Sequence, residues 1–418
     1  MKMIFLLLLG CGEEDTASLA QKEAINYYED VRPVLAQHCV RCHSSGGQGP
    51  GDFLNPEEAA PLADLMIASI DAGTMPPPAS DPSCHDYQGA DYLFIPEEKR
   101  EIIRSWAEQG APIGPKDKAL SIDHLLMETE IEDPDLVVKI QEPYAPTFQD
   151  DRNPGNEYRC FALEHGQEEP FYITALHPII DTPSLVHHIV LAKSREDGLV
   201  SGSKDLEGAN CINNGAFITD FRSGAMLGGW APGMQPIRLP EGAGILVQPD
   251  EYIVIQMHYY QGSNSEGATD QSAYAFETTD TVEHTLQMFP MGTQDFTIPA
   301  GDPSYTQTSS IGLPMNLKIW GVFPHMHILG SEYHSWLEHE DGSQTCLARS
   351  DHYDFYNQLQ YIFRKEEEFS KHDTMKVSCT WNNAAENPNL IHNPPIDIGY
   401  GERTDEEMCY VFTMVSFD

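Results

Sequence analysis

Pro324-His325-Met326-His327 is the stretch of this chain that says most about its fold and chemistry. Alternate residues of a β-strand point to the same face of a sheet, so His325 and His327 can hold a single metal ion. Further candidate ligands are spread widely along the chain, and they are His187, His188, His258 and Met408. The set predicts three histidines for one metal ion, and two histidines plus a thioether for a second.

The methionine makes copper the favoured metal. A thioether is a soft ligand that suits Cu(I), whereas imidazole suits both oxidation states of copper. A site of histidines alone and a site that includes Met408 can divide electron storage from oxygen chemistry. The pattern therefore indicates a two-copper oxidase or oxygenase and disfavours a zinc hydrolase.

The histidine pair also has a simpler explanation. His187 and His188 lie in a strand-like run, where adjacent side chains point to opposite faces of a sheet. Both can bind one ion only at a bend or a strand end; otherwise one belongs to the core and the other to the surface. His258 is ambiguous by itself, because a lone histidine in a strand is usually structural.

The sequence from about Asp135 onward predicts an all-β region. Short runs rich in β-branched and aromatic residues are bounded by Gly, Pro, Asn and Asp, as in antiparallel sandwiches. The runs are Phe171–Ile173, Tyr252–Gln256, Leu317–Trp320, Lys376–Ser378 and Tyr410–Phe417. About 280 residues are many for one sandwich, so we expect two jelly-roll-like sandwiches, over residues 136–265 and 266–418. The break would lie in the polar stretch Gln261–Gln271.

A small all-α unit is expected over residues 27–113. The run Tyr27–Leu35 has apolar residues at helical spacing. Pro96–Trp106 begins with a proline, has acidic residues in its first turn and is followed by Gly110, which predicts a closing helix. Residues 114–135 are expected to form a linker to the β region.

The helical unit carries Cys39-Val40-Arg41-Cys42-His43, which matches the attachment pattern of c-type haem. In that pattern the thiols of Cys39 and Cys42 add to the haem vinyl groups, and His43 becomes an axial ligand of the iron. A chance cysteine pair and a zinc site are the alternatives, but no second Cys/His pair with zinc spacing lies nearby. One covalently bound haem c is therefore predicted.

The second axial ligand is predicted to be Met75, which stands in a proline-rich loop. Such a loop holds the thioether at low entropic cost, and Met/His ligation raises the haem potential. Met66 is the alternative, but it lies in an apolar helical stretch and is better explained as a core residue. The unit resembles a class I cytochrome c, an electron carrier with both axial positions filled.

The first residues predict export. They contain one lysine, a short apolar run and Leu8-Leu9-Gly10-Cys11, which resembles a bacterial lipobox. We expect residues 1–11 to be a lipoprotein signal peptide with Cys11 lipidated, and residues 12–26 to be a polar tether. The chain would lie in the bacterial periplasm or on the outer-membrane surface, attached to the membrane by lipid alone. An unlipidated signal peptide and a misassigned start are the alternatives.

Composition narrows the partners. The 418 residues are 40% hydrophobic, as in a globular protein, and carry a net charge of −41. Nucleic acid is therefore a poor partner, because binding it requires clustered Lys and Arg. Six cysteines remain beside Cys11, Cys39 and Cys42, and an even number in an exported chain favours disulfides. They are Cys84, Cys160, Cys211, Cys346, Cys379 and Cys409.

In combination and order, the histidine motifs resemble the copper type II, ascorbate-dependent monooxygenases, the family of dopamine β-monooxygenase and peptidylglycine α-hydroxylating monooxygenase. The resemblance runs from about Asn156 to the C-terminus. Its motifs are His187-His188, Gln256-Met257-His258-Tyr259, His325-Met326-His327-Ile328-Leu329-Gly330, Cys379-Thr380-Trp381-Asn382 and Glu407-Met408-Cys409.

The resemblance implies two eight-stranded β-sandwiches that face a solvent-filled cleft, with one copper ion on each. It implies that His187, His188 and His258 hold an electron-storing copper. His325, His327 and Met408 would hold the copper that binds O2 and would be the catalytic residues. It also implies a disulfide between Cys379 and Cys409, while the pairing of the other four cysteines stays open.

One departure from the family concerns the substrate. The peptidylglycine enzymes have an arginine for the peptide carboxylate where this chain has Phe323, and a substrate-contacting tyrosine where it has Phe412. A peptide C-terminus is therefore not expected as substrate. The acidic runs Glu366–Glu368 and Glu406–Glu407 are interpreted as solvated faces.

The sequence thus predicts a copper monooxygenase that converts a C–H bond of a small organic substrate to C–OH with O2. Two electrons would come from an ascorbate-like reductant or a redox protein, pass through the fused haem to the three-histidine copper, and continue to the oxygen site. A secreted electron-transfer or copper-holding protein without turnover is the second hypothesis. A β-sandwich binding module with incidental histidines is the third.

Overall fold

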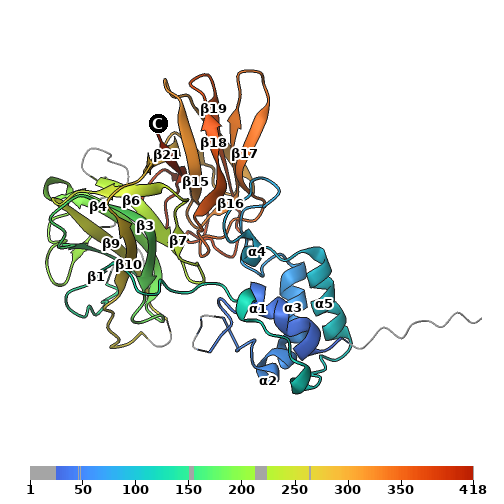
Figure 1. Cartoon of the computed structure of the whole chain (residues 1–418). Helices are drawn as coiled ribbons and strands as arrows, with labels where there is room; N and C mark the ends of the chain where they lie inside the picture. The colour runs from blue at the N-terminus through green and yellow to red at the C-terminus, as the bar shows by residue number, and fades with distance from the viewer. Residues whose placement is uncertain are drawn as a thin grey trace, which may run out of the picture.

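Figure 1 shows a helical unit beside two β-sandwiches. This computed structural model describes residues 25–45, 47, 49–149, 155–211, 224–262 and 265–417. The two sandwiches confirm the predicted all-β region. The predicted signal peptide, its Cys11 and most of the tether lie outside the described residues.

The helical unit surrounds a small apolar core. The predicted closing helix forms directly after Pro96, and Gly110 follows it with a φ of 78°, a left-handed conformation that glycine adopts without strain. Trp106 and Tyr27 are fully buried in this core. The helices are η1 (Tyr27–Val31), α1 (Arg32–His38), α2 (Pro56–Ala59), η2 (Ala60–Leu62), α3 (Ala63–Asp71), α4 (Ala90–Leu93) and α5 (Glu97–Glu108). The connection to the sandwiches contains the short turns η3 (Lys116–Lys118) and η4 (Asp123–Leu125).

The first sandwich has a sheet ordered β1-β10-β3-β8-β11, with β7 beside β3, and a sheet ordered β5-β2-β9-β4-β6. Its strand pairs are antiparallel apart from the short β8–β11 pair. The strands are β1 (Leu136–Lys139), β2 (Asn156–Leu163), β3 (Phe171–Ile179), β4 (Val186–Arg195), β5 (Ala209–Asn210), β6 (Gly224–Trp230), β7 (Ile237–Arg238), β8 (Ala243–Val247), β9 (Glu251–Tyr260), β10 (Ala273–Thr279) and β11 (His284–Thr285), with a turn η5 (Glu196–Gly198) after β4.

The second sandwich has two four-stranded sheets, ordered β12-β21-β15-β18 and β14-β19-β16-β17, and a small β13-β20 pair. The strands are β12 (Gln287–Thr293), β13 (Thr297–Ile298), β14 (Tyr305–Ile311), β15 (Leu317–His325), β16 (Gly330–Glu338), β17 (Gln344–Ser350), β18 (Tyr361–Phe369), β19 (Thr374–Trp381), β20 (Ile398–Gly399) and β21 (Cys409–Ser416). Its two main sheets match the eight strands implied by the resemblance, whereas the first sandwich has more.

The predicted boundary between the sandwiches is wrong in position. The polar stretch near residue 265 connects β9 to β10, and β10 pairs with β1 and β3 of the first sandwich. The chain passes to the second sandwich only after β11, since β12 pairs with β21. The polar stretch is a surface loop within one domain, and its composition does not differ from that of a linker.

The pattern of buried and exposed side chains along a strand shows whether one face or both faces of the strand are enclosed. β16 buries every second residue from Tyr333 to Leu337, as a strand with one solvated face does. β21 is buried at each of its positions and lies between β12 and β15. Met408, directly before β21, is therefore attached to one of the most enclosed strands of the molecule.

The helical unit is docked on the second sandwich and not merely tethered to it. The disulfide Cys84–Cys346 links the two parts. Hydrogen bonds also join the two parts: the Gln88 N–H donates to the Ile362 carbonyl at 2.8 Å, and the Ser80 N–H donates to the Tyr361 side-chain hydroxyl at 2.8 Å. The position of the helical unit relative to the sandwich is thus fixed by covalent, polar and apolar contacts together.

Disulfides Cys160–Cys211 and Cys379–Cys409 complete the pairing of the six cysteines, the second as the resemblance implied. Three disulfides are typical of a protein in an oxidising, extracellular or secreted setting. None of the helices in the described part of the chain has both the length and the apolar character needed to cross a bilayer.

Replacing Cys84 and Cys346 together by serine should uncouple the helical unit from the sandwich. We expect a loss of about 2–4 kcal/mol in the free energy of unfolding of the helical unit, because the bridge closes a long loop. Far-UV circular dichroism, to which the helices contribute most, and tryptophan fluorescence, to which four of the five tryptophans contribute from the sandwiches, show during urea unfolding whether the two parts unfold together. The matched change, Cys160→Ser with Cys211→Ser, should leave both signals coupled. Coincident transitions in the Cys84/Cys346 variant would show that the bridge does not hold the unit.

Candidate metal centres

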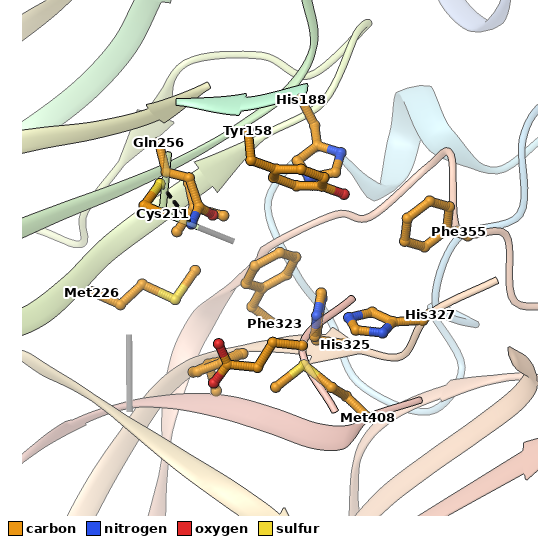
Figure 2. A pocket seen from close by; sticks show the side chains of 13 residues that line it. Tyr158, His188, Cys211, Met226, Gln256, Phe323, His325, His327, Phe355 and Met408 are labelled. Atoms are coloured by element: carbon orange, nitrogen blue, oxygen red, sulfur yellow. Dashed lines mark hydrogen bonds between the residues drawn. The ribbon is translucent and has the colours of Figure 1, made fainter. Parts of the chain in front are cut away.

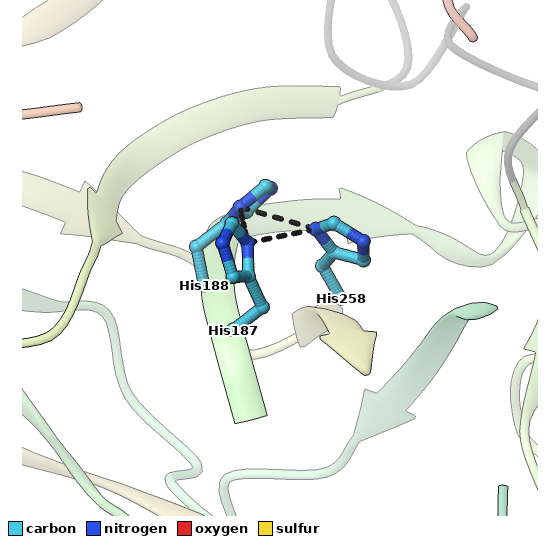
Figure 3. Close-up of side chains that lie close together, drawn as sticks. All are labelled: His187, His188 and His258. Carbon is cyan, nitrogen blue, oxygen red and sulfur yellow. Dashed lines mark hydrogen bonds between the residues drawn. The ribbon is translucent and has the colours of Figure 1, made fainter. Parts of the chain in front are cut away.

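The histidine pair and His258 converge on neighbouring strands of the first sandwich, as Figure 3 shows. In the β4–β9 pair His188 lies opposite His258, and the register shifts between Val186 and His188. This irregularity, of the β-bulge kind, lets His187 point to the same side as His188. The bend that both histidines need in order to share one ion is therefore present.

The three rings fit a metal ion. Their Nδ1 atoms form a triangle with sides of 3.0 Å between His187 and His188, 3.2 Å between His187 and His258, and 3.2 Å between His188 and His258. The centre of this triangle lies about 1.8 Å from each nitrogen, close to the bond of about 2.0 Å between imidazole and a first-row metal. Three nitrogens so close cannot all carry a proton, so a metal ion is the group that suits them.

Burial keeps these imidazoles neutral. It lowers the pKa of His187 to about 4 and the pKa values of His188 and His258 well below the usual range. The Nε2–H of His258 donates to Asn156 Oδ1 at 2.8 Å, which leaves Nδ1 as the free lone pair. Tyr158 stacks on the same ring with 4.1 Å between centroids.

The second centre forms at the end of β15. His325 is the last residue of β15 and lies opposite Tyr410 of β21 in antiparallel register, so the chain beyond it runs alongside Met408. The ring centroids of His325 and His327 are 5.2 Å apart. In Figure 2 the Met408 thioether lies beside both rings. The two histidines and the methionine are thus brought together as predicted, although His327 lies beyond the strand.

Hydrogen bonds select the free nitrogen of each ring. His325 Nδ1–H donates to Gln358 Oε1 at 2.5 Å, and His327 Nδ1–H donates to the Glu406 carbonyl at 3.0 Å. Each ring therefore presents Nε2 to the centre, whereas the three-histidine centre uses Nδ1. Burial lowers the pKa of His325 to about 4 and that of His327 to about 3, so both rings are neutral.

Glu407 holds the second centre together, and its interpretation as part of a solvated face is wrong. The side chain has 0% exposure. Its carboxylate accepts four N–H groups: from His327 at 2.9 Å, Leu329 at 2.7 Å, the Trp381 indole at 2.8 Å and Met408 at 3.3 Å. Burial raises the pKa of Glu407, and the four N–H donors oppose this rise by stabilising the carboxylate. One carboxylate thus fixes the backbone of two candidate ligands.

A single apolar cavity of about 70 Å³ is lined by residues of both centres (Figure 2). His188 contributes from the first centre, and the second contributes both histidines and Met408. The Phe355 ring lies between them, with its centroid 6.2 Å from those of His188 and His327. The remaining walls include Tyr158, Met226, Gln256, Phe323 and Phe412. The implied open cleft is therefore a narrow, mostly apolar space.

A larger crevice of about 490 Å³ lies in the helical unit. Cys39, Cys42 and His43 line it, and both thiols are free. The His43 Nδ1–H donates to the Pro50 carbonyl at 2.9 Å, which leaves Nε2 unprotonated, and its ring stacks on Phe53 at 4.1 Å. Free thiols, an oriented imidazole and an apolar crevice are the features that a covalently attached haem requires.

Both candidate second ligands line this crevice. Met75 follows α3 and is 40% exposed, whereas Met66 is 8% exposed and packs in the core of the helical unit. The core position of Met66 agrees with its interpretation as a packing residue. Met75 lies outside that core, so its side chain could move to bind an iron without disturbing the core packing.

Several residues of the centres are not evident from the sequence. Asn156, Gln358 and Glu407 act through hydrogen bonds, and Phe355 through its position between the rings. Strand pairing was the only signal that could have found Asn156 and Tyr158, which lie on β2 beside β9. The loop that supplies Phe355 and Gln358 has no regular structure and no motif.

Paired sandwiches with a three-histidine centre and a His/His/Met centre around one cavity define a metal-dependent oxidoreductase of the copper type. Residues 147–266 match the family model described as "Copper type II ascorbate-dependent monooxygenase, N-terminal domain". Residues 288–415 match the model of the C-terminal domain of the same family. The two matches cover more than half of the chain, which therefore belongs to the copper type II ascorbate-dependent monooxygenase family.

The other comparisons add no functional information. No curated protein matches the chain. Among solved structures, the major capsid protein P2 of bacteriophage PM2 is 8% identical, with 62% of this chain and 97% of that chain covered and a TM-score of 0.24. The cowpea mosaic virus top component is 10% identical, with 71% and 93% covered and a TM-score of 0.25. TM-scores this low carry no argument about fold or function.

Glu407→Gln should weaken the second centre. An amide cannot accept from all four donors, so at least one buried N–H loses its partner, at a cost of about 1–3 kcal/mol in the free energy of unfolding. Urea unfolding of the metal-free protein followed by tryptophan fluorescence measures this loss. Glu386→Gln makes the same substitution at an exposed side chain and should change the midpoint little. Equal midpoints for the two variants would contradict the role given to Glu407.

Proposed function

We propose that this protein uses two copper ions and O2 to hydroxylate a C–H bond of a small organic substrate. The observation that carries the proposal is the single apolar cavity lined by both His188 and the His325/His327/Met408 centre. One oxygen atom would enter the substrate as C–OH and the other would leave as water, with two electrons and two protons supplied from outside. Family membership supports the copper-dependent monooxygenase class.

Copper held by His187, His188 and His258 would supply electron storage, and copper held by His325, His327 and Met408 would supply reductive activation of dioxygen. The residues around these ligands hold them in place through hydrogen bonds. Asn156 and Gln358 fix the ring orientations, and Glu407 fixes the backbone that carries His327 and Met408. Because the rings are already neutral, metal binding displaces no proton from them at neutral pH.

The cavity favours a small, largely apolar substrate without a carboxylate, because its walls are mostly apolar and the charged side chain among them, Glu402, is an acid. Phe323 and Phe412 are 5% and 3% exposed, and their rings lie 6.0 Å apart beside the second centre. The Gln256 amide is a neutral hydrogen-bonding group on the wall. With Phe323 in place of an arginine, the cavity has no cation for a carboxylate among its lining residues, so a peptide C-terminus fits poorly.

We further propose that the helical unit is a cytochrome c with one covalent haem. Cys39 and Cys42 would form the thioether bonds, and His43 and Met75 would be the axial ligands. This haem would pass electrons from an ascorbate-like reductant or a redox protein to the three-histidine copper. With Cys11 lipidated, the protein would be exported to the bacterial periplasm or the outer-membrane surface and held there by lipid alone.

Met408→Leu should abolish hydroxylation, because it keeps the apolar volume but removes the thioether. Oxygen uptake with ascorbate and a panel of small aliphatic and aromatic compounds, neutral and amine-bearing, with product analysis, measures the activity. The haem absorption spectrum should not change. Met326→Leu makes the same substitution between the two histidines and should retain activity. Wild-type turnover in Met408→Leu would count against the assigned oxygen site.

A further inference from the structure

The loop between β17 and β18 borders both candidate metal centres and the crevice of the helical unit. Asp354, Tyr356 and Asn357 form part of the wall of the helical unit's crevice, together with Pro232 of the first sandwich. The crevice is therefore closed on one side by the sandwiches. A group seated in it would face this loop directly.

The same loop reaches the three-histidine centre. The Tyr356 ring lies 5.2 Å from the His187 ring, centroid to centroid, and is nearly perpendicular to it at 88°. The Phe355 ring is 5.4 Å from Tyr356 and 6.3 Å from His187. The Tyr356 side chain thus borders both the crevice and the His187 ring.

The loop is held in place at both ends. Tyr353 donates its hydroxyl to the Met326 carbonyl at 2.8 Å and accepts the Met326 N–H at 3.1 Å. The Asn357 side chain donates to the Pro78 carbonyl of the helical unit at 2.8 Å. The geometry between crevice and copper centre is therefore set by the fold and does not depend on a flexible tether.

We propose that Tyr356 is the residue through which an electron passes from the crevice of the helical unit to the His187 side of the three-histidine centre. This inference rests on the proposed haem and copper sites and adds a route between them. In each transfer one electron leaves ferrous haem, which becomes ferric, and reduces Cu(II) to Cu(I). No bond forms or breaks and no proton moves. The aromatic ring serves as the bridge, and the tyrosine stays a phenol.

Burial and the neighbouring Tyr260 and Asp354 raise the pKa of Tyr356, so the phenol keeps its proton at neutral pH. A route that requires only the ring predicts that phenylalanine can replace tyrosine. A route that requires the hydroxyl predicts that it cannot. The two possibilities are separable by one substitution.

The test uses the full chain with haem and copper bound. A laser flash with a photoreductant reduces the haem while the coppers are Cu(II), and haem absorbance then follows its reoxidation. Tyr356→Leu should lose the fast, concentration-independent phase, and Tyr356→Phe should keep it. Copper content, the copper EPR spectrum and the haem potential should be unchanged in both.

Tyr260→Leu is the matched control. Tyr260 is 48% exposed against 51% for Tyr356, and its ring is 6.2 Å from His187, but it does not line the crevice. It should keep the fast phase. A fast phase retained in Tyr356→Leu, or lost in Tyr356→Phe, would overturn the proposal. A wild-type protein that lacks haem or copper would instead refute the proposed function, before any variant is made.

Discussion

The buried carboxylate of Glu407 is the interaction on which the second centre depends. It lies between the turn after β15 and the start of β21, and it accepts N–H groups from His327, Leu329, Met408 and the indole of Trp381. A turn that leaves a sheet exposes backbone donors, and burying them unpaired would cost free energy for each one. Glu407 satisfies them with one side chain. The candidate ligands are therefore positioned by the fold itself.

Contacts with surrounding residues also position the histidines and the helical unit. Asn156 orients His258, Gln358 orients His325, and the loop from Tyr353 to Gln358 joins both centres to the helical unit. The disulfide Cys84–Cys346 and the backbone pairing around Gln88 hold that unit against the second sandwich. The proposed electron donor would thus have a defined orientation, which matters because electron transfer through protein slows steeply with distance.

The candidate ligands could be predicted because their chemistry depends on residue type and spacing. His325 and His327 alternate along the chain, Met408 precedes a buried strand, and Cys39, Cys42 and His43 form a contiguous motif. The supporting residues could not be predicted in the same way. Glu407 looks like any acidic surface residue until the fold buries it, and Asn156 and Gln358 become relevant only through strand pairing and loop position. The domain boundary failed for a related reason, since a polar loop inside a sandwich has the composition of a linker.

The central claim is that one chain carries two copper centres and a haem that transfers electrons to them. Metal analysis of the purified protein, after reconstitution with copper, tests this most directly. The account predicts two copper atoms and one haem iron per chain, with distinct three-nitrogen and nitrogen/sulfur copper environments in X-ray absorption. Copper at zero or one per chain after reconstitution would contradict it, and a protein that binds or transfers electrons without oxygen chemistry would become the better description.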